Sequence, residues 1–502
     1  MRKYSKIVLT GLILTLSMTS CLDKLPDDAI PENEAINTVS DANQAVIGIY
    51  AKFKSSALYS GYLTLLPDLQ SDLVQAVEGY TNTYGDTWRW EVKATNDEVE
   101  AVYGELYGVI GRCNFLLENM DKVESNTYDE TDLNKLVLYN GEAHFARALA
   151  YAELIKMYCK AYDPATADNE QGVALVTSYS NPGKLTRASL KASYQRVLDD
   201  LKVAEECLAI DDDDTQTLYN STYFTIGAVN ALYARVYLYM QDWENAVKYS
   251  TKVIESGKYL LSSATTQYSN SGYSYYDYMW NYDSSTEIIW KVGFEITSYG
   301  GALGRIFQNY DYISYKPDYI PANWVLNLYS NTDLRYDSFF KSVATGYTHG
   351  LTCPILMKYP GNLNFQVQNI LHVNMPKVFR LSEQYLIRAE AYCQQGNYSK
   401  AGSDISTLRK ARYSTYGNAT AITESTWLDI IGEERVKELY MEGFRLQDLK
   451  RWHKGFERKA QTNTIAPGNA LKILADDKRF VWPIPQHELE SPDADIQPNE
   501  SN

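Results

Sequence analysis

The chain has 502 residues, of which 45% are hydrophobic and 22% are charged, and its formal net charge at pH 7 is −16. A strongly acidic surface repels the phosphates of nucleic acids, so the composition argues against nucleic-acid binding. The length exceeds the size at which a single hydrophobic core normally stops growing, so we expect two cooperating lobes.

Residues 1–20 have the features of a lipoprotein signal peptide. Three basic residues precede an apolar stretch over residues 7–18, which is shorter than the roughly 20 residues that span a bilayer. Cys21 follows, at the position of the cysteine that is acylated in such signals. We therefore expect a lipid-anchored mature chain with a formal net charge of −19, because Arg2, Lys3 and Lys6 leave with the signal. The alternative is an ordinary secretory signal with a chance cysteine.

Residues 21–37 predict a flexible acidic tether between the lipid and the folded protein. Pro26 and Pro31 interrupt any helix here, and five acidic residues surround them, namely Asp23, Asp27, Asp28, Glu32 and Glu34.

The region over residues 38–259 has mainly helical periodicity. Apolar residues recur at three- and four-residue steps in four segments, which are residues 99–120, 133–160, 190–209 and 222–240. The sequence thus predicts a helical N-terminal region.

Residues 230–254 have the spacing of a tetratricopeptide helix pair. Small residues let two antiparallel helices approach closely, while a tyrosine fills the groove between them. The same spacing recurs 155 residues later, which predicts a second pair, and the first two long helices are expected to form another. The residues concerned are Ala234, Tyr237 and Ala246 in the first pair, and Ala389, Tyr392 and Ala401 in the second.

Residues 260–348 differ in texture, because Tyr, Ser, Asn and Gly crowd them and strand-like pieces such as residues 287–296 are short. We expect an irregular, loop-rich lobe, mounted on the helical scaffold within a C-terminal region over residues 260–502. Such loops commonly carry recognition.

Motifs for catalysis, cofactors and metals are not found in the sequence. There is no G-x-S-x-G or H-E-x-x-H, and the glycines at 300–304 lack the order of a dinucleotide loop. The aspartates at 211–214 lack the alternating spacing of a calcium loop and predict a solvated connector, although bound calcium stays open. The five cysteines after Cys21 show no CxxC spacing and are expected to be core thiols. We expect no cofactor, no metal and no enzymatic activity.

Residues 434–452 concentrate carboxylates and arginines on what the pattern predicts to be one helix. Glu442 with Arg445, and Asp448 with Arg451, have the three-residue spacing of charge pairs on one helix face. The segment is therefore interpreted as scaffold and not as a catalytic site.

Several segments, taken in order, resemble the SusD/RagB family of nutrient-binding outer-membrane lipoproteins. They are the lipoprotein start, GEAHFARA at 141–148, the first helix pair, LSEQYLIRAEA at 381–391, EER at 433–435 leading to EGFRLQDLKRW at 442–452, and WPIPQHEL at 482–489. The resemblance implies four tetratricopeptide-like helix pairs carrying a variable lobe, and a lid-like role over a TonB-dependent transporter barrel. It also implies oligosaccharide ligands, or oligopeptides as in the RagB branch.

Aromatic residues are abundant, with 43 Tyr and 9 Trp. A tyrosine offers a flat apolar face and a hydroxyl, which suit a sugar ring or a peptide side chain. Rings in loops have no obvious core to enter, so we expect the ligand-binding residues to be Trp88, Trp90, Tyr80, Tyr84, Tyr276, Tyr299 and Tyr312, together with Asp72.

Alternative roles remain for these residues. Residues 88–90 (Trp-Arg-Trp) resemble a segment of the ligand face in starch-binding members, whereas core packing would explain many of the tyrosines. Asp68, Gln70 and Asp72 are either ligand-binding groups or caps of their own loop backbone.

The expected function is that of a surface-exposed outer-membrane lipoprotein that captures oligosaccharides and delivers them to a SusC-like TonB-dependent transporter. The same role for oligopeptides is one alternative, a surface glycoside hydrolase a second, and a structural adaptor a third.

Overall fold

The computed structural model describes residues 34–77, 83–210, 221–347, 350–459, 471–492 and 494–502. Cys21, most of the expected tether, Tyr80 and the aspartates at 211–214 lie outside these residues.

Long helices form most of the N-terminal region, as the periodicity predicted. Side chains cap the first turns of three of them. Thr38 and Asp41 form a capping box at the start of the helix that begins at Val39, and Asp129 and Ser189 cap the helices that begin at Glu130 and Leu190. The helices are α2 (Val39–Lys52), α3 (Tyr62–Leu69), α4 (Gly85–Trp88), α5 (Asp97–Ser125), α6 (Glu130–Tyr158) and α7 (Leu190–Leu208). Within the residues that the structure describes, no helix is both long enough and apolar enough to cross a membrane.

Both predicted tetratricopeptide-like pairs are confirmed. The first is α8 (Ile226–Tyr239) with α9 (Trp243–Ile254), and the second is α15 (Leu381–Gln394) with α16 (Tyr398–Arg412). The four small residues at their crossings are fully buried. Helix α9 packs directly against α15, so two units distant in sequence are neighbours in space.

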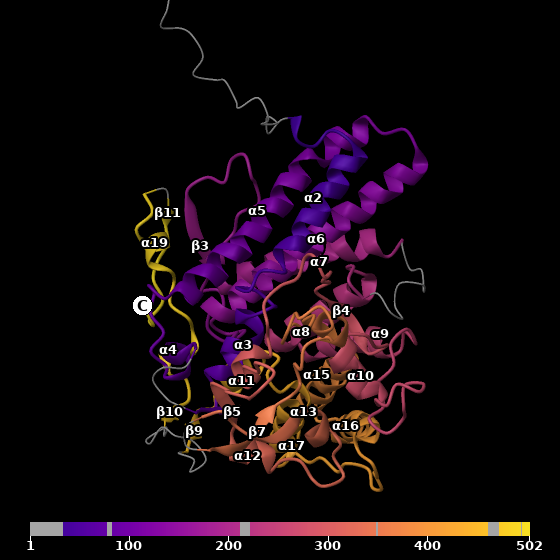
Figure 1. The fold of residues 1–502 in the computed structure, drawn as a ribbon. Helices are drawn as coiled ribbons and strands as arrows, with labels where there is room; N and C mark the ends of the chain where they lie inside the picture. The colour runs from indigo at the N-terminus through magenta and orange to yellow at the C-terminus, as the bar shows by residue number, and fades with distance from the viewer. Residues whose placement is uncertain (1–33, 78–82, 211–220, 348–349, 460–470, 493) are drawn as a thin grey trace, which may run out of the picture.

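The helices therefore make one continuous stack, in which α5, α6, α7, α8, α9, α15 and α16 each contact the next, and α17 (Trp427–Leu439) packs on α15 and α16. The N-terminal helices occupy the upper part of Figure 1 and the later pairs the lower part.

A lobe of short elements lies between the two pairs in sequence, as expected. It contains α10 (Tyr275–Tyr282), β4 (Ile288–Lys291), α11 (Arg305–Gln308), β5 (Tyr319–Pro321), α12 (Asn323–Leu326), α13 (Arg335–Phe339), β6 (Phe340–Ala344), β7 (Thr352–Leu356), α14 (Leu363–Gln366) and β8 (Lys377–Arg380). Strand β4 pairs with β8, β6 with β7, and β5 with β1 (Val74–Ala76), all antiparallel.

The last segment returns along the N-terminal helices, at the left edge of Figure 1. Strand β11 (Ala494–Asp495) pairs in parallel with β3 (Leu185–Ser189), which pairs with β2 (Gln171–Ala174). Before it come α18 (Arg445–Arg451), β9 (Phe456–Arg458), β10 (Leu471–Ile473), η3 (Lys478–Phe480) and α19 (Gln486–Leu489).

The largest cluster of buried apolar side chains joins these parts. It contains Val46 of α2, Leu149 of α6, Phe379 of β8 and Trp482 near the C-terminus. The boundary between the two regions at residues 259 and 260 stays a prediction.

The prediction of one helix over residues 434–452 is wrong. The chain leaves α17 at Tyr440 and enters α18 at Arg445, and Met441 and Gly443 have φ angles of 59° and 85°. A Cβ atom on Gly443 would lie 2.3 Å from the carbonyl oxygen of Leu63, so this break lets the chain pass close to α3.

Of the two charge pairs expected in this segment, one forms. Asp448 and Arg451 lie 2.8 Å apart, which confirms that pair. Glu442 instead binds Lys358 at 2.6 Å and Arg380 at 2.7 Å, because the break turns it away from Arg445.

Buried ion pairs connect the lobe to the last helices. Glu438 of α17 accepts hydrogen bonds from three fully buried arginines, Arg335, Arg380 and Arg412, at 2.9–3.0 Å. These charges outweigh the effect of burial and hold the pKa of Glu438 well below its usual value. These carboxylates are held in buried ion pairs, which agrees with the interpretation as scaffold, although only one of the two pairs expected from spacing forms.

Candidate ligand-binding face

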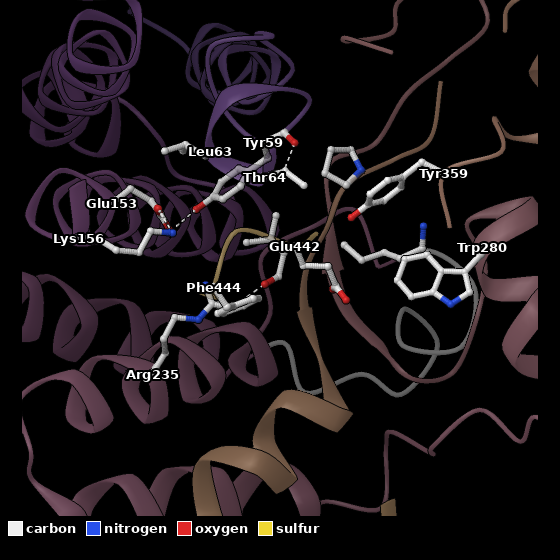
Figure 2. A pocket seen from close by; sticks show the side chains of 13 residues that line it. Tyr59, Leu63, Thr64, Glu153, Lys156, Arg235, Trp280, Tyr359, Glu442 and Phe444 are labelled. Atoms are coloured by element: carbon white, nitrogen blue, oxygen red, sulfur yellow. Dashed lines mark hydrogen bonds and ion pairs between the residues drawn. The ribbon is translucent and has the colours of Figure 1, made fainter. Parts of the chain in front are cut away.

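A small polar cavity lies where the N-terminal helices meet the C-terminal ones (Figure 2). Tyr59 and Lys156 point to Glu153 in one wall, with the Tyr59 hydroxyl 3.1 Å from the carboxylate. Phe444 and Arg235 lie below them, and the Arg235 guanidinium binds Glu383 at 2.7 Å. The cavity holds about 20 Å³, which fits a water molecule and not a nutrient.

Trp88 and Trp90 are not on the surface, so the expectation that these loop rings are exposed is wrong. Their exposed fractions are 4% and 2%. The Trp88 indole donates to the Val74 carbonyl at 3.3 Å and carries the Arg458 guanidinium 4.4 Å above its ring. The Trp90 indole donates to the Gln70 carbonyl and packs edge-on against Phe480. Both rings pack between segments that are distant in the sequence. The polar, loop-like sequence around them gave no sign of these partners.

Tyr276 and Asp72 are also buried, which corrects two further expectations. Tyr276 is fully buried in α10, with the Arg412 guanidinium 4.2 Å from its ring centre. Asp72 accepts two hydrogen bonds of 2.9 Å from the Arg445 guanidinium. Tyr276 is closed off from the surface, and the Asp72 carboxylate is engaged by Arg445.

Asp68 has neither of the two roles that were left open, because it is fully buried and caps a distant segment instead of its own loop. Its carboxylate accepts the backbone N–H groups of Gly443 at 3.1 Å and Arg445 at 2.8 Å. Burial raises the pKa of Asp68 to about 7, against the opposing effect of these two hydrogen bonds.

Tyr299 and Tyr312 are exposed, with exposed fractions of 46% and 58%. Both border the segment that contains α14. The Tyr299 ring centre lies 6.3 Å from that of Phe365, and the Tyr312 hydroxyl donates to Asn369 at 3.3 Å. Two of the predicted residues therefore contact one short segment, residues 365–369.

A third ring lies beside Tyr312. Tyr310 is half-buried, with its ring centre 6.0 Å from that of Tyr312, and it stacks at 4.5 Å on Tyr315. Its backbone N–H donates to His372 at 3.2 Å, which fixes the loop to the turn after α14.

Tyr84 is linked to this group through the chain around Ser60. The Ser60 hydroxyl accepts the backbone N–H of Gly301, two residues after Tyr299, at 3.0 Å, and Tyr62 follows two residues after Ser60. Tyr84 is half-buried and packs edge-on against Tyr62 at 5.5 Å, and burial raises its pKa to about 12. The exposed Arg305 follows Gly304, whose backbone N–H donates to the His372 carbonyl at 3.2 Å, so Arg305 begins beside the residue that also holds the Tyr310 backbone. We name the set Tyr84, Tyr299, Arg305, Tyr310 and Tyr312 the tyrosine face.

This face combines aromatic rings, phenol hydroxyls and one guanidinium. Rings can stack on the apolar face of a sugar, while hydroxyl and guanidinium groups bind its hydroxyls. It is built from loops held by the helical stack, so its parts are placed by a rigid scaffold.

The sequence pattern did not single out three further exposed or half-buried rings. Tyr223 fell inside the helix predicted from residue 222, but α8 begins at Ile226 and Tyr223 is half exposed beside a groove of about 330 Å³. Trp324 and Trp452 line a second hollow of about 270 Å³. Short helices of four residues such as α12 carry no periodicity that would have marked Trp324.

Comparison with known proteins adds two family matches that together cover most of the chain. Residues 21–238 match the family described as "Starch-binding associating with outer membrane", and residues 346–499 match the SusD family. "SusD-like protein P38" of Formosa agariphila is 23% identical over 96% of this chain and 97% of its own length. "Starch-binding protein SusD" of Bacteroides thetaiotaomicron is 35% identical over 22% of this chain and 18% of its own.

Solved structures show the same fold. A SusD superfamily protein from Bacteroides thetaiotaomicron is 25% identical, covers 92% of this chain with 99% of its own, and has a TM-score of 0.77. A SusD-like carbohydrate binding protein from Bacteroides vulgatus is 20% identical over 91% of this chain and 96% of its own, with a TM-score of 0.73. The ordered motifs, the stacked helix pairs and these matches agree, and the chain belongs to the SusD/RagB family.

Proposed function

We propose that this chain is a surface-exposed outer-membrane lipoprotein that captures oligosaccharides at the tyrosine face and delivers them to a SusC-like TonB-dependent transporter. The observation that carries the proposal is that the exposed rings of Tyr299 and Tyr312, and the backbone at Gly304 and Tyr310, all contact residues 365–372. Exposed rings on a rigid scaffold suit ligand binding, whereas they contribute little to packing of the core.

The choice of a glycan rests on chemistry and on relatives. Tyrosine rings with free edges suit sugar rings, and two related proteins are named for starch or carbohydrate binding. The membrane location rests on Cys21 after the signal-like segment and on a family described as associating with the outer membrane.

Oligopeptide capture is the first alternative, because the same rings and Arg305 would also bind peptide side chains and a carboxylate. A glycoside hydrolase is less well supported by this face. Asp311 accepts the backbone N–H groups of Ile313 and Ser314, and these bonds lower its pKa, whereas a catalytic acid needs a raised one.

Isothermal titration tests the proposal. The chain from residue 22 onward would be titrated with neutral oligosaccharides and, separately, with a mixed tryptic peptide digest, while the sugars are checked for hydrolysis by chromatography. We expect heat from at least one oligosaccharide, with the sugar recovered intact. Heat from peptides alone would contradict the glycan assignment, and shortened sugars would contradict a purely binding role.

A further inference from the structure

A groove runs between the second half of α2 and the chain that continues from β4. It holds about 330 Å³, near the lower end of the range of about 300–1,000 Å³ for small-molecule sites. Tyr50, Trp290 and Phe294 form its aromatic part, and the half-exposed Tyr223 stands at its rim with its ring edge-on to Tyr50 at 6.0 Å. An apolar floor with one exposed ring suits the flat face of a sugar.

Polar groups stand at the mouth of this groove. The Lys54 amine donates to the Ser298 carbonyl at 3.4 Å and to its hydroxyl at 3.3 Å, which leaves one of its three N–H donors for a ligand. Glu295 is exposed, and its carboxylate forms no ion pair within the part of the chain that the structure describes. One donor and one acceptor beside an aromatic floor fit the hydroxyls of a sugar better than a wholly apolar ligand.

The groove and the tyrosine face are neighbours. Glu295 and Ser298 form a tight turn through two backbone hydrogen bonds of 3.0 and 2.9 Å, and Tyr299 follows directly. The next residue, Gly300, lies so close to the chain just after α2 that a Cβ atom on it would be 2.5 Å from the Lys54 carbonyl oxygen. Lys54 thus touches the groove on one side and the start of the tyrosine face on the other.

We propose that the groove is a second subsite for the same ligand, so that one oligosaccharide chain lies across the tyrosine face and continues past Lys54 into the groove beside Tyr223. This rests on the proposed function and narrows it to chains long enough to reach both places. A monosaccharide or disaccharide would fill one subsite only. Affinity would then grow with chain length because both subsites act on one linked ligand.

Length series of sugars test this subsite. The probes would be linear α-1,4-glucans, β-1,4-glucans, β-1,3-glucans, β-1,4-mannans and β-1,4-xylans, each from disaccharide to heptasaccharide, titrated into the chain from residue 22 onward. We expect the series that binds to gain about tenfold in affinity once the chain spans both subsites.

Two variants separate the groove from the face. Tyr223→Ala removes the rim ring, and Ala51→Arg fills the groove from an exposed position of α2 without removing a contact. Both are expected to lower the affinity for the longest sugar about tenfold and to leave the shortest binding sugar unchanged. Tyr128→Ala, at an exposed tyrosine in the turn between α5 and α6, is the matched control.

Three outcomes overturn the idea, and they differ from one another. The second subsite would be excluded by an affinity that does not depend on chain length, or by variants whose affinity for long sugars is unchanged. In that case Tyr299→Ala would still test the tyrosine face. Equal losses for short and long sugars would place the first sugar unit in the groove itself. Failure of the unmodified chain to bind any series would contradict the proposed function as well.

Discussion

Individual residues show why loop position was a poor guide to exposure. Tyr299 and Trp88 both come from segments rich in small and polar residues, yet one ring is half exposed and the other is 4% exposed. Trp88 is buried by Tyr319 and Arg458, which are more than 200 residues away in sequence. A local sequence pattern carries no information about such partners, so the burial of the Trp88 ring could not be predicted from it.

The burial of Trp88 makes a prediction about stability. Trp88→Ala should lower the free energy of unfolding by about 3–5 kcal/mol, because it opens a cavity and leaves the Val74 carbonyl and Arg458 without their indole partner. Urea denaturation measures this change. A variant of unchanged stability that loses sugar binding would instead restore Trp88 as a ligand residue.

Asp68 makes a prediction about pH. Its folded-state pKa of about 7 lies above the usual 3.8, so its contribution to stability is fully present below pH 3.8 and is lost as pH rises toward 7. Asp68→Asn cannot ionise. The stability of this variant relative to the unmodified chain should therefore improve by up to about 4 kcal/mol between pH 4 and pH 7.

Urea unfolding at several pH values, carried out on both chains, measures that difference. A difference that stays constant with pH would show that the carboxyl is not protonated in the folded state. A free energy of unfolding that is lower for Asp68→Asn by the same amount at every pH would reflect the two backbone N–H groups, because Asn cannot accept both hydrogen bonds.

At the scale of helices and strands, periodicity was a good guide. The four long helices and both helix pairs were predicted because their apolar and small residues repeat at fixed steps, and such steps are a local property. The break between α17 and α18 was not predicted. Its cause is the contact of Gly443 with the backbone of α3, some 380 residues earlier in the chain.

That contact can be tested with a pair of glycine variants. Gly443→Ala should lower the free energy of unfolding by about 1–3 kcal/mol, because its φ angle is 85° and its Cβ atom would meet the Leu63 carbonyl oxygen at 2.3 Å. Gly111→Ala is the matched control, since it lies inside α5 with open space around it and should be neutral or stabilising. Equal effects of the two substitutions would contradict the strained break.

For the whole molecule, the motifs predicted the family and the stack of helix pairs, and the structure adds how distant pairs meet. Helix α9 packs on α15 and strand β11 pairs with β3, so the scaffold joins segments that are far apart in the sequence. The tyrosine face could be predicted as a type of surface but not as a complete set of residues. Three of its five members were recognised from the sequence, whereas the positions of the other two depend on contacts between loops.

The central claim is that the tyrosine face binds an oligosaccharide, and the double variant Tyr299→Ala with Tyr312→Ala tests it most directly. Both rings are exposed, so the fold should persist, and the affinity of the sugar identified by titration should fall at least tenfold, a loss of about 1.4 kcal/mol or more. Tyr128→Ala, which removes an exposed ring elsewhere, should bind as the unmodified chain does. If the double variant binds the sugar with the same affinity as the unmodified chain, the tyrosine face is not the binding site.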